Sequence, residues 1–173
     1  AVLPGDGADP PPIAHWPAGN PPAAPPAATP EVLTAQPFGR LAVHFRAERC
    51  HEYLDDVREP LPLFRDERVA HPGWLLRFAN FVLTANVRLG PWIHVESSVQ
   101  FFGPVTDGDL VETRARVTGE YERKGHRFVD LDVVQLVGDR PITRTAHSAI
   151  YRPRGSKTGA DSLGEESDLL EPG

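Results

Sequence analysis

This sequence lacks the features that mark several large classes of protein. Cys50 is the only cysteine among 173 residues, so neither an intrachain disulfide nor a zinc site built from cysteines is possible. Lysine and arginine form no run, and the formal net charge of −6 gives no electrostatic basis for binding nucleic acid. No apolar stretch approaches the ~20 residues that a membrane-spanning helix needs. We therefore expect neither a nucleic acid nor a membrane as a partner.

Motifs for metal binding, phosphate binding and secretion are absent as well. The seven histidines include no pair spaced four residues apart, so we expect no metal site. The sequence contains no glycine-rich phosphate loop and no Gly-x-Ser-x-Gly nucleophile motif. It does not open with a charged segment followed by an apolar one, as secretory signals do, so a cytoplasmic location is the expectation.

The distribution of proline and of small polar residues divides the chain into three parts. More than half of the nineteen prolines fall within residues 1–37, which lack apolar periodicity and are predicted to form a disordered arm or linker. Docking of His15 and Trp16 on the folded part is the alternative for this arm. Residues 155–173 are small, polar and acidic, which predicts a disordered tail. Residues 38–154 remain as one folded domain.

Within the domain, the hydrophobic periods predict one strand, two helices and then four more strands. A helix over 47–57 ends before Pro60 and Pro62, because proline cannot continue a helix. A longer helix over 73–87 follows Pro72, which stands where a helix start tolerates proline. The predicted strands span residues 40–45, 91–102, 110–123, 127–137 and 142–153.

The longer helix indicates the fold class. Its polar residues form one narrow stripe on an otherwise apolar cylinder, at Arg77, Asn80, Thr84 and Arg88. A long antiparallel sheet curled around this helix is the simplest packing that buries it. The order of elements therefore predicts an α+β protein.

Three segments of the domain match motifs of a known family. They are "AHPGWLL" at the start of the longer helix, "SSVQFFGPVTDGDLVETRARV" with its Gly108-Asp109 turn, and "HSAIYRPR" at the end of the last strand. In these segments residues 38–154 resemble the hot-dog superfamily, and within it the MaoC-like acyl-CoA hydratase and dehydratase branch. The resemblance implies a hot-dog fold, acyl-CoA or a related thioester as ligand with no other cofactor, and a homodimer or a pairing with a second hot-dog domain.

The sequence departs from this family at the residues that carry its chemistry. The hydratases of the branch have an Asp-x-Asn-Pro-(Ile/Leu)-His motif ahead of the central helix. When Pro60 is matched to the motif proline, Val57 stands at the aspartate position and Pro62 at the histidine position. The related acyl-carrier-protein dehydratases place a glutamate on the central helix, and Phe78 stands there in this sequence. Neither catalytic pair is present as the family has it.

The His71-Pro72-Gly73 turn is the first candidate for the site. Amide groups in the first turn of a helix lack intrahelical partners and can stabilise the oxyanion of a thioester carbonyl. We expect His71 to act as an acid or base, Gly73 to supply an amide, and Trp74 and Asn80 to contact the substrate. The alternative is that His71 caps the helix and Gly73 only packs closely.

The other candidates for acid–base chemistry lie outside this turn. Asp56 and Glu59 are in the loop that precedes the longer helix, from which a carboxylate can reach a substrate. His94 and Glu96 are two residues apart in a predicted strand, so they are expected to share a face. A solvated loop and a solvent-facing pair are the alternatives for these residues.

These candidates leave three functions open. The first is hydration of an enoyl thioester, or dehydration of the 3-hydroxyacyl form, with a non-standard set of catalytic residues. The second is thioester hydrolysis with Glu59, Asp56 or Glu96 as base. The third is a non-catalytic hot-dog subunit that binds acyl chains or stabilises an active partner, which the missing Asp/His pair favours. One fold supports all three, so the fold alone does not choose among them.

Overall fold

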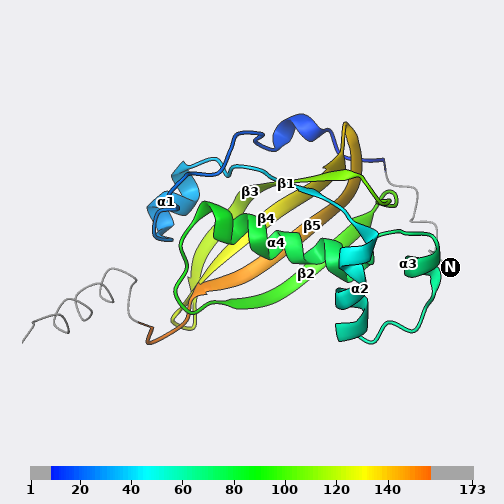
Figure 1. Cartoon of the computed structure of the whole chain (residues 1–173). Coiled ribbons are helices and arrows are strands. Elements are labelled where there is room, and N and C mark those ends of the chain that lie inside the picture. The colour runs from blue at the N-terminus through cyan, green and yellow to red at the C-terminus, as the bar shows by residue number, and fades with distance from the viewer. Residues whose placement is uncertain (1–8, 157–173) are drawn as a thin grey trace, which may run out of the picture.

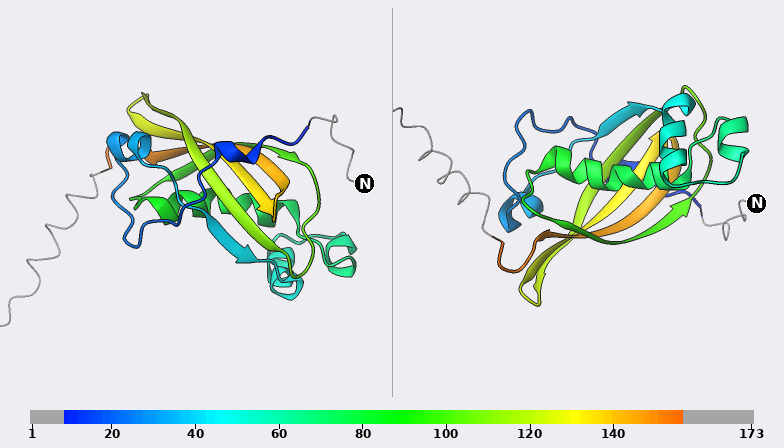
Figure 2. Two further views of the ribbon diagram at one scale, coloured as in Figure 1. Left: turned by 90° about the horizontal axis from the view of Figure 1, so that it is seen from above. Right: turned by 60° about the horizontal axis from the view of Figure 1, so that its bottom comes forward.

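The computed structural model describes residues 9–156, and these form one antiparallel sheet with a helix on its concave side. The strands lie in the order β1-β3-β4-β5-β2. Their bounds are β1 Leu41–His44, β2 Ile93–Phe101, β3 Leu110–Arg123, β4 His126–Val137 and β5 Arg140–Arg152. Figures 1 and 2 show the sheet curving around helix α4 (Pro72–Asn86). This arrangement confirms the predicted α+β hot-dog fold.

Two tight turns hold the three central strands together. Lys124 and Gly125 both have positive φ in the turn from β3 to β4, and Gly138 has φ 59° in the turn from β4 to β5. Along β3, Val111 and Ala115 point toward the core, as the alternating pattern of its residues predicts. The hairpins therefore fix which residues of each strand face α4.

Helix α4 fills the concave face because one side of it is apolar along its full length. His71 caps its N-terminus, Pro72 occupies the first helical position, and the chain becomes extended at Val87. Its buried residues are Trp74, Leu75, Phe78, Ala79, Val82, Leu83 and Asn86. Several of them pack on Leu131 and Val133 of β4, which places the main core between α4 and the sheet.

Two shorter helices lie near the start of α4. Helix α2 (Ala47–Asp56) ends before the two prolines, as predicted, and buries Cys50 and Leu54. Helix α3 (Leu63–Asp66) is a single turn that the hydrophobic pattern did not predict. None of the helices within residues 9–156 combines the length and apolar character that a membrane crossing requires.

The proline-rich arm differs from its predicted disorder over residues 9–37. It contains a short 3-10 helix, η1 (Ile13–His15), and helix α1 (Pro30–Ala35). Trp16 is 3% exposed, and its indole nitrogen donates a hydrogen bond to the Asp132 carbonyl oxygen at 2.8 Å. The η1 segment lies on the face of the sheet opposite α4 (Figure 2), whereas α1 packs through Leu33 on the core at the C-terminal end of α4. A few apolar anchors thus hold the arm, and composition alone does not identify such anchors. Of the predicted tail, residues 157–173 lie outside the described part of the chain.

Candidate functional site

The N-terminus of α4 carries a histidine–glutamate pair. His71 Nδ1 accepts a hydrogen bond from the Gly73 amide at 3.0 Å, so the ring hydrogen resides on Nε2. Nε2 lies 3.0 Å from Glu59 Oε2 and donates to it. The other carboxylate oxygen of Glu59 accepts a hydrogen bond from the Leu61 amide at 2.9 Å. The two side chains are only 19% and 15% exposed, so the pair is partly shielded from water.

The loop between α2 and α3 brings Glu59 to His71. Arg58 adopts a left-handed conformation with φ 54°, which reverses the chain directly after α2. The rings of Tyr53 and Phe64 pack against the imidazole of His71, with ring centres 5.6 and 4.7 Å away. The histidine is thus held by two hydrogen bonds and two aromatic contacts. Of the acid–base candidates predicted from sequence, His71 and Glu59 are the two whose side chains the structure joins by a hydrogen bond.

Gly73 and Trp74 do not have the roles that the sequence suggested. The Gly73 amide is bonded to His71 Nδ1, and the amides of Trp74 and Leu75 are bonded to the His71 carbonyl oxygen. These amides therefore offer no free donor to a substrate oxygen, and the helix-capping alternative fits the geometry. A Cβ atom at Gly73 would collide with the Tyr53 hydroxyl, so glycine is needed for this close contact. Trp74 is a core residue that packs edge-on against Phe45 and Phe78.

Asp56 and Asn80 do not join the His71–Glu59 pair. Asp56 is exposed at the last position of α2, and within residues 9–156 no hydrogen bond or ion pair links it to His71. Asn80 is in the middle of α4, and its side-chain oxygen is buried without a hydrogen-bond partner in the described structure. The polar stripe on α4 is partly covered, because Arg77 lies over the Tyr53 ring at 4.8 Å.

The expectation that His94 and Glu96 share a face is wrong, because β2 is irregular at this point. His94 pairs with Ala149 of β5, whereas Glu96 pairs with Ser148, and the register shifts between them. A β-bulge adds one residue to a strand, so side chains two positions apart then point to opposite faces. His94 instead shares the helix-facing side with Ser97, which pairs with His147.

Ser97 links two histidines on this side of the sheet. Its hydroxyl lies 3.0 Å from His94 Nε2 and 3.0 Å from His147 Nδ1, and the two rings are stacked with centres 4.7 Å apart. His147 is 3% exposed. Burial, and to a smaller extent the nearby His94, lower the pKa of His147 to about 4. The sequence pattern did not identify Ser97 or His147 as site residues, because the cluster depends on the β2–β5 register.

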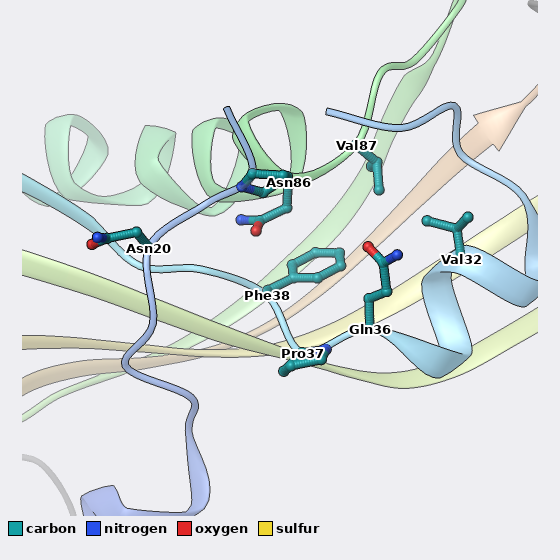
Figure 3. Close-up of a pocket in the computed structure, with 8 residues that line it drawn as sticks. Asn20, Val32, Gln36, Pro37, Phe38, Asn86 and Val87 are labelled. Carbon is teal, nitrogen blue, oxygen red and sulfur yellow. The ribbon is translucent and has the colours of Figure 1, made fainter. Parts of the chain in front are cut away.

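A hollow of about 220 Å³ lies at the other end of α4 (Figure 3). It is lined by apolar groups, among them Phe38 and Val87, and by polar ones, among them Gln36 and Asn86. The side-chain oxygen of Asn86 accepts a hydrogen bond from the backbone amide of Gly39. Its side-chain nitrogen donates to the carbonyl oxygens of Gly39 and Val82. Asn86 thereby ties the end of α4 to the segment that leads into β1.

The described residues show no arrangement suited to a metal ion. No group of three or more histidine, cysteine, aspartate or glutamate side chains in residues 9–156 is positioned to hold one. The site chemistry that the geometry offers is therefore that of the His71–Glu59 pair and of the His94–Ser97–His147 cluster.

Comparisons with known proteins identify the fold. No protein-family model matches this sequence, and no curated protein matches it. Among solved structures, one is the HadBC complex of Mycobacterium tuberculosis, a 3R-hydroxyacyl-ACP dehydratase. It is 20% identical with a TM-score of 0.54, over 63% of this chain and 89% of that chain. The (R)-hydratase from A. caviae involved in PHA biosynthesis is 18% identical with a TM-score of 0.55, over 66% and 96%.

A third structure is a two-component assembly. It is the ChsH1-ChsH2 complex of Mycobacterium tuberculosis, which is 12% identical with a TM-score of 0.56, over 66% of this chain and 94% of that chain. At these identities the similarity concerns the fold. It agrees with the arrangement of the sheet around the central helix: the chain has the hot-dog fold.

Proposed function

We propose that this protein binds an acyl thioester, such as acyl-CoA, and interconverts its enoyl and 3-hydroxyacyl forms by adding or removing water. The observation that carries the proposal is the His71–Glu59 pair, a histidine and a carboxylate 3.0 Å apart at the start of the central helix. The hydratase and dehydratase named among the structures of similar fold support this reaction class.

Glu59 is the group that moves the proton in this proposal. Hydration requires a base that takes a proton from water while the water oxygen bonds to the β-carbon, and an acid that then delivers a proton to the α-carbon. Each carboxylate oxygen of Glu59 has one hydrogen bond and retains a lone pair, so one carboxylate can perform both steps. His71 is a positioning residue here, because both of its ring nitrogens are already bonded.

The experiment is a hydration assay with crotonyl-CoA, followed by the loss of enoyl absorbance. Glu59→Gln keeps the shape of the side chain and one of its two acceptor oxygens but removes the base, so kcat should fall by about 10²–10⁴-fold. His71→Asn retains a capping acceptor and removes the hydrogen bond to Glu59, so kcat should fall with little change in KM. Asp56→Asn, a carboxylate change at the exposed end of α2, is the matched control. Full activity of Glu59→Gln would contradict the proposal.

A second candidate function is a non-catalytic acyl-binding subunit, which the occupied amides of the first turn of α4 favour. In this case the wild-type protein binds acyl-CoA with saturation but turns over neither crotonyl-CoA nor acetyl-CoA. Release of free thiol from acetyl-CoA would instead show thioester hydrolysis, the alternative activity.

We further propose that the protein pairs with a second hot-dog domain, either another copy or a related chain. Strand β2 lies at an edge of the sheet, and its Ile93 and Val95 side chains are 49% and 46% exposed. An exposed apolar edge strand offers unpaired backbone groups to another strand. The two-component complexes among the similar structures support this arrangement. Sedimentation velocity of wild type and Val95→Lys tests it, since a charge at the edge should shift the protein toward monomer.

A further inference from the structure

The His94–Ser97–His147 cluster runs from the surface of the molecule to its interior. His94 is exposed on the edge strand β2, Ser97 is partly buried, and His147 is almost fully buried on the central strand β5. Hydrogen bonds of 3.0 Å join the three side chains in this order. The cluster takes no part in the His71–Glu59 pair.

The inner end of the cluster is unsatisfied. His147 Nε2 is buried and has no hydrogen-bond partner in the described structure. His147 faces α4, because its neighbour across the β4–β5 ladder is Leu131, a residue of the core beneath that helix. Native proteins pair nearly all such groups, so the unpaired His147 Nε2 between α4 and the sheet indicates a missing partner.

The bulge in β2 supports a specific role for the cluster. It turns the His94 side chain onto the helix-facing side, where it stacks on His147 and reaches Ser97. Bulges are frequent beside functional sites, where they re-aim a side chain. The stacked ring and the Ser97 bond together fix the direction in which His147 Nε2 points.

The hydrogen-bonding needs of the site identify the chemistry of the missing partner. If Ser97 donates to His147 Nδ1, then Nε2 carries a hydrogen and requires an acceptor; if the direction is reversed, Nε2 requires a donor. A hydroxyl group can either donate or accept and therefore suits both cases, whereas a carbonyl oxygen only accepts and an unsubstituted hydrocarbon chain does neither.

We propose that His147 Nε2 is a second binding site, which takes a hydroxyl group carried on the chain of an acyl ligand. The identity of the ligand as an acyl thioester rests on the proposed function. His147 lies on β5 and is separate from the His71–Glu59 pair at the start of α4, so a thioester placed at that pair meets this site through a hydroxyl further along its chain.

The test compares matched ligands by isothermal titration calorimetry. The probes are 8-hydroxyoctanoyl-, 10-hydroxydecanoyl- and 12-hydroxydodecanoyl-CoA, each against its unsubstituted counterpart. At least one hydroxylated chain should bind wild type about tenfold more tightly than its counterpart, the effect of one buried hydrogen bond. His147→Phe keeps a ring and removes both nitrogens, so it should abolish this preference while still binding the unsubstituted chain. His44→Phe, an exposed histidine at the opposite edge of the sheet, should retain the preference.

A second measurement avoids dependence on the folding of a variant. Long-range ¹⁵N–¹H NMR spectra of the wild-type histidine rings should show a shift at His147 Nε2 when the preferred hydroxylated ligand is added. Equal affinity for both members of every pair, or no change at His147, overturns this inference and leaves the hydration proposal in place. Failure of wild type to bind any acyl-CoA overturns both.

Discussion

Buried His147 should make the protein less stable as the pH falls from neutral toward 4.5. Its side chain is 3% exposed, and burial lowers its pKa from 6.5 to about 4. In the unfolded chain the same histidine has its ordinary pKa. Below pH 6.5 the unfolded state therefore binds a proton that the folded state does not bind until the pH approaches 4. Stability is lost as the pH falls through this window.

The size of the effect follows from these two pKa values. At pH 7.5 the histidine is neutral in both states and contributes almost nothing to the pH dependence. At pH 4.5 the linkage relation gives a loss of about 2.5 kcal/mol in the free energy of unfolding. This is a large part of the stability of an ordinary domain, for which about 5–15 kcal/mol is usual.

The assay is urea unfolding of wild type and His147→Phe at pH 7.5 and at pH 4.5. Every other titrating group is common to the two proteins, so the difference between their pH dependences isolates His147, apart from its effect on neighbouring His94. Wild type should lose about 2.5 kcal/mol more than the variant between these pH values. If the two proteins lose the same free energy, then His147 is not held neutral by burial and the reasoning fails.

Three further substitutions test how the fold holds the site. For each, the cost given is the loss in the free energy of unfolding, measured with urea at neutral pH. Trp16→Ala should cost about 3–5 kcal/mol, because it empties a buried ring position and removes the bond to Asp132; an effect near zero would show that the arm does not stabilise the domain. Gly73→Ala should cost about 1–3 kcal/mol through the collision with the Tyr53 hydroxyl, and most of this loss should disappear in a Tyr53→Phe background. Asn86→Ala should cost about 1–3 kcal/mol for each backbone group it leaves unpaired, and a cost below that of one group would contradict the buried bonds to Gly39.

The sheet and the central helix were predictable because their signals are local. The alternation along β3 and the apolar cylinder of 73–87 are repeated many times within short segments, so each residue supports the same assignment. For the arm, docking of Trp16 was only the alternative to disorder, since the order of the arm depends on a few contacts such as that of Trp16 with Val134 and Leu136 on the sheet. Those contacts join residues far apart in the chain, and the arm has no hydrophobic periodicity from which they could be predicted.

The candidate site shows the same division between local and tertiary signals. His71 was found because the His-Pro-Gly order at a helix start is visible in the sequence. Glu59 was one of several carboxylates in its loop, and the reversal at Arg58 that selects it is a tertiary result. Ser97 and His147 come together only through the register of β2 and β5. Residues two apart in a regular strand share a face, but the bulge after His94 places Glu96 on the opposite face.

Pairing through β2 and ligand binding at the histidine cluster are compatible, although both involve the same strand. An added strand bonds to backbone groups in the plane of the sheet, whereas side chains project perpendicular to it. The His94 and Ser97 side chains project toward α4, so a partner strand alongside β2 leaves their hydrogen bonds intact. Such a partner places its own side chains next to His94, the exposed end of the cluster. Val95→Lys should therefore weaken pairing without removing the preference of His147 for a hydroxylated chain, and loss of both together would mean that the second subunit completes the binding site.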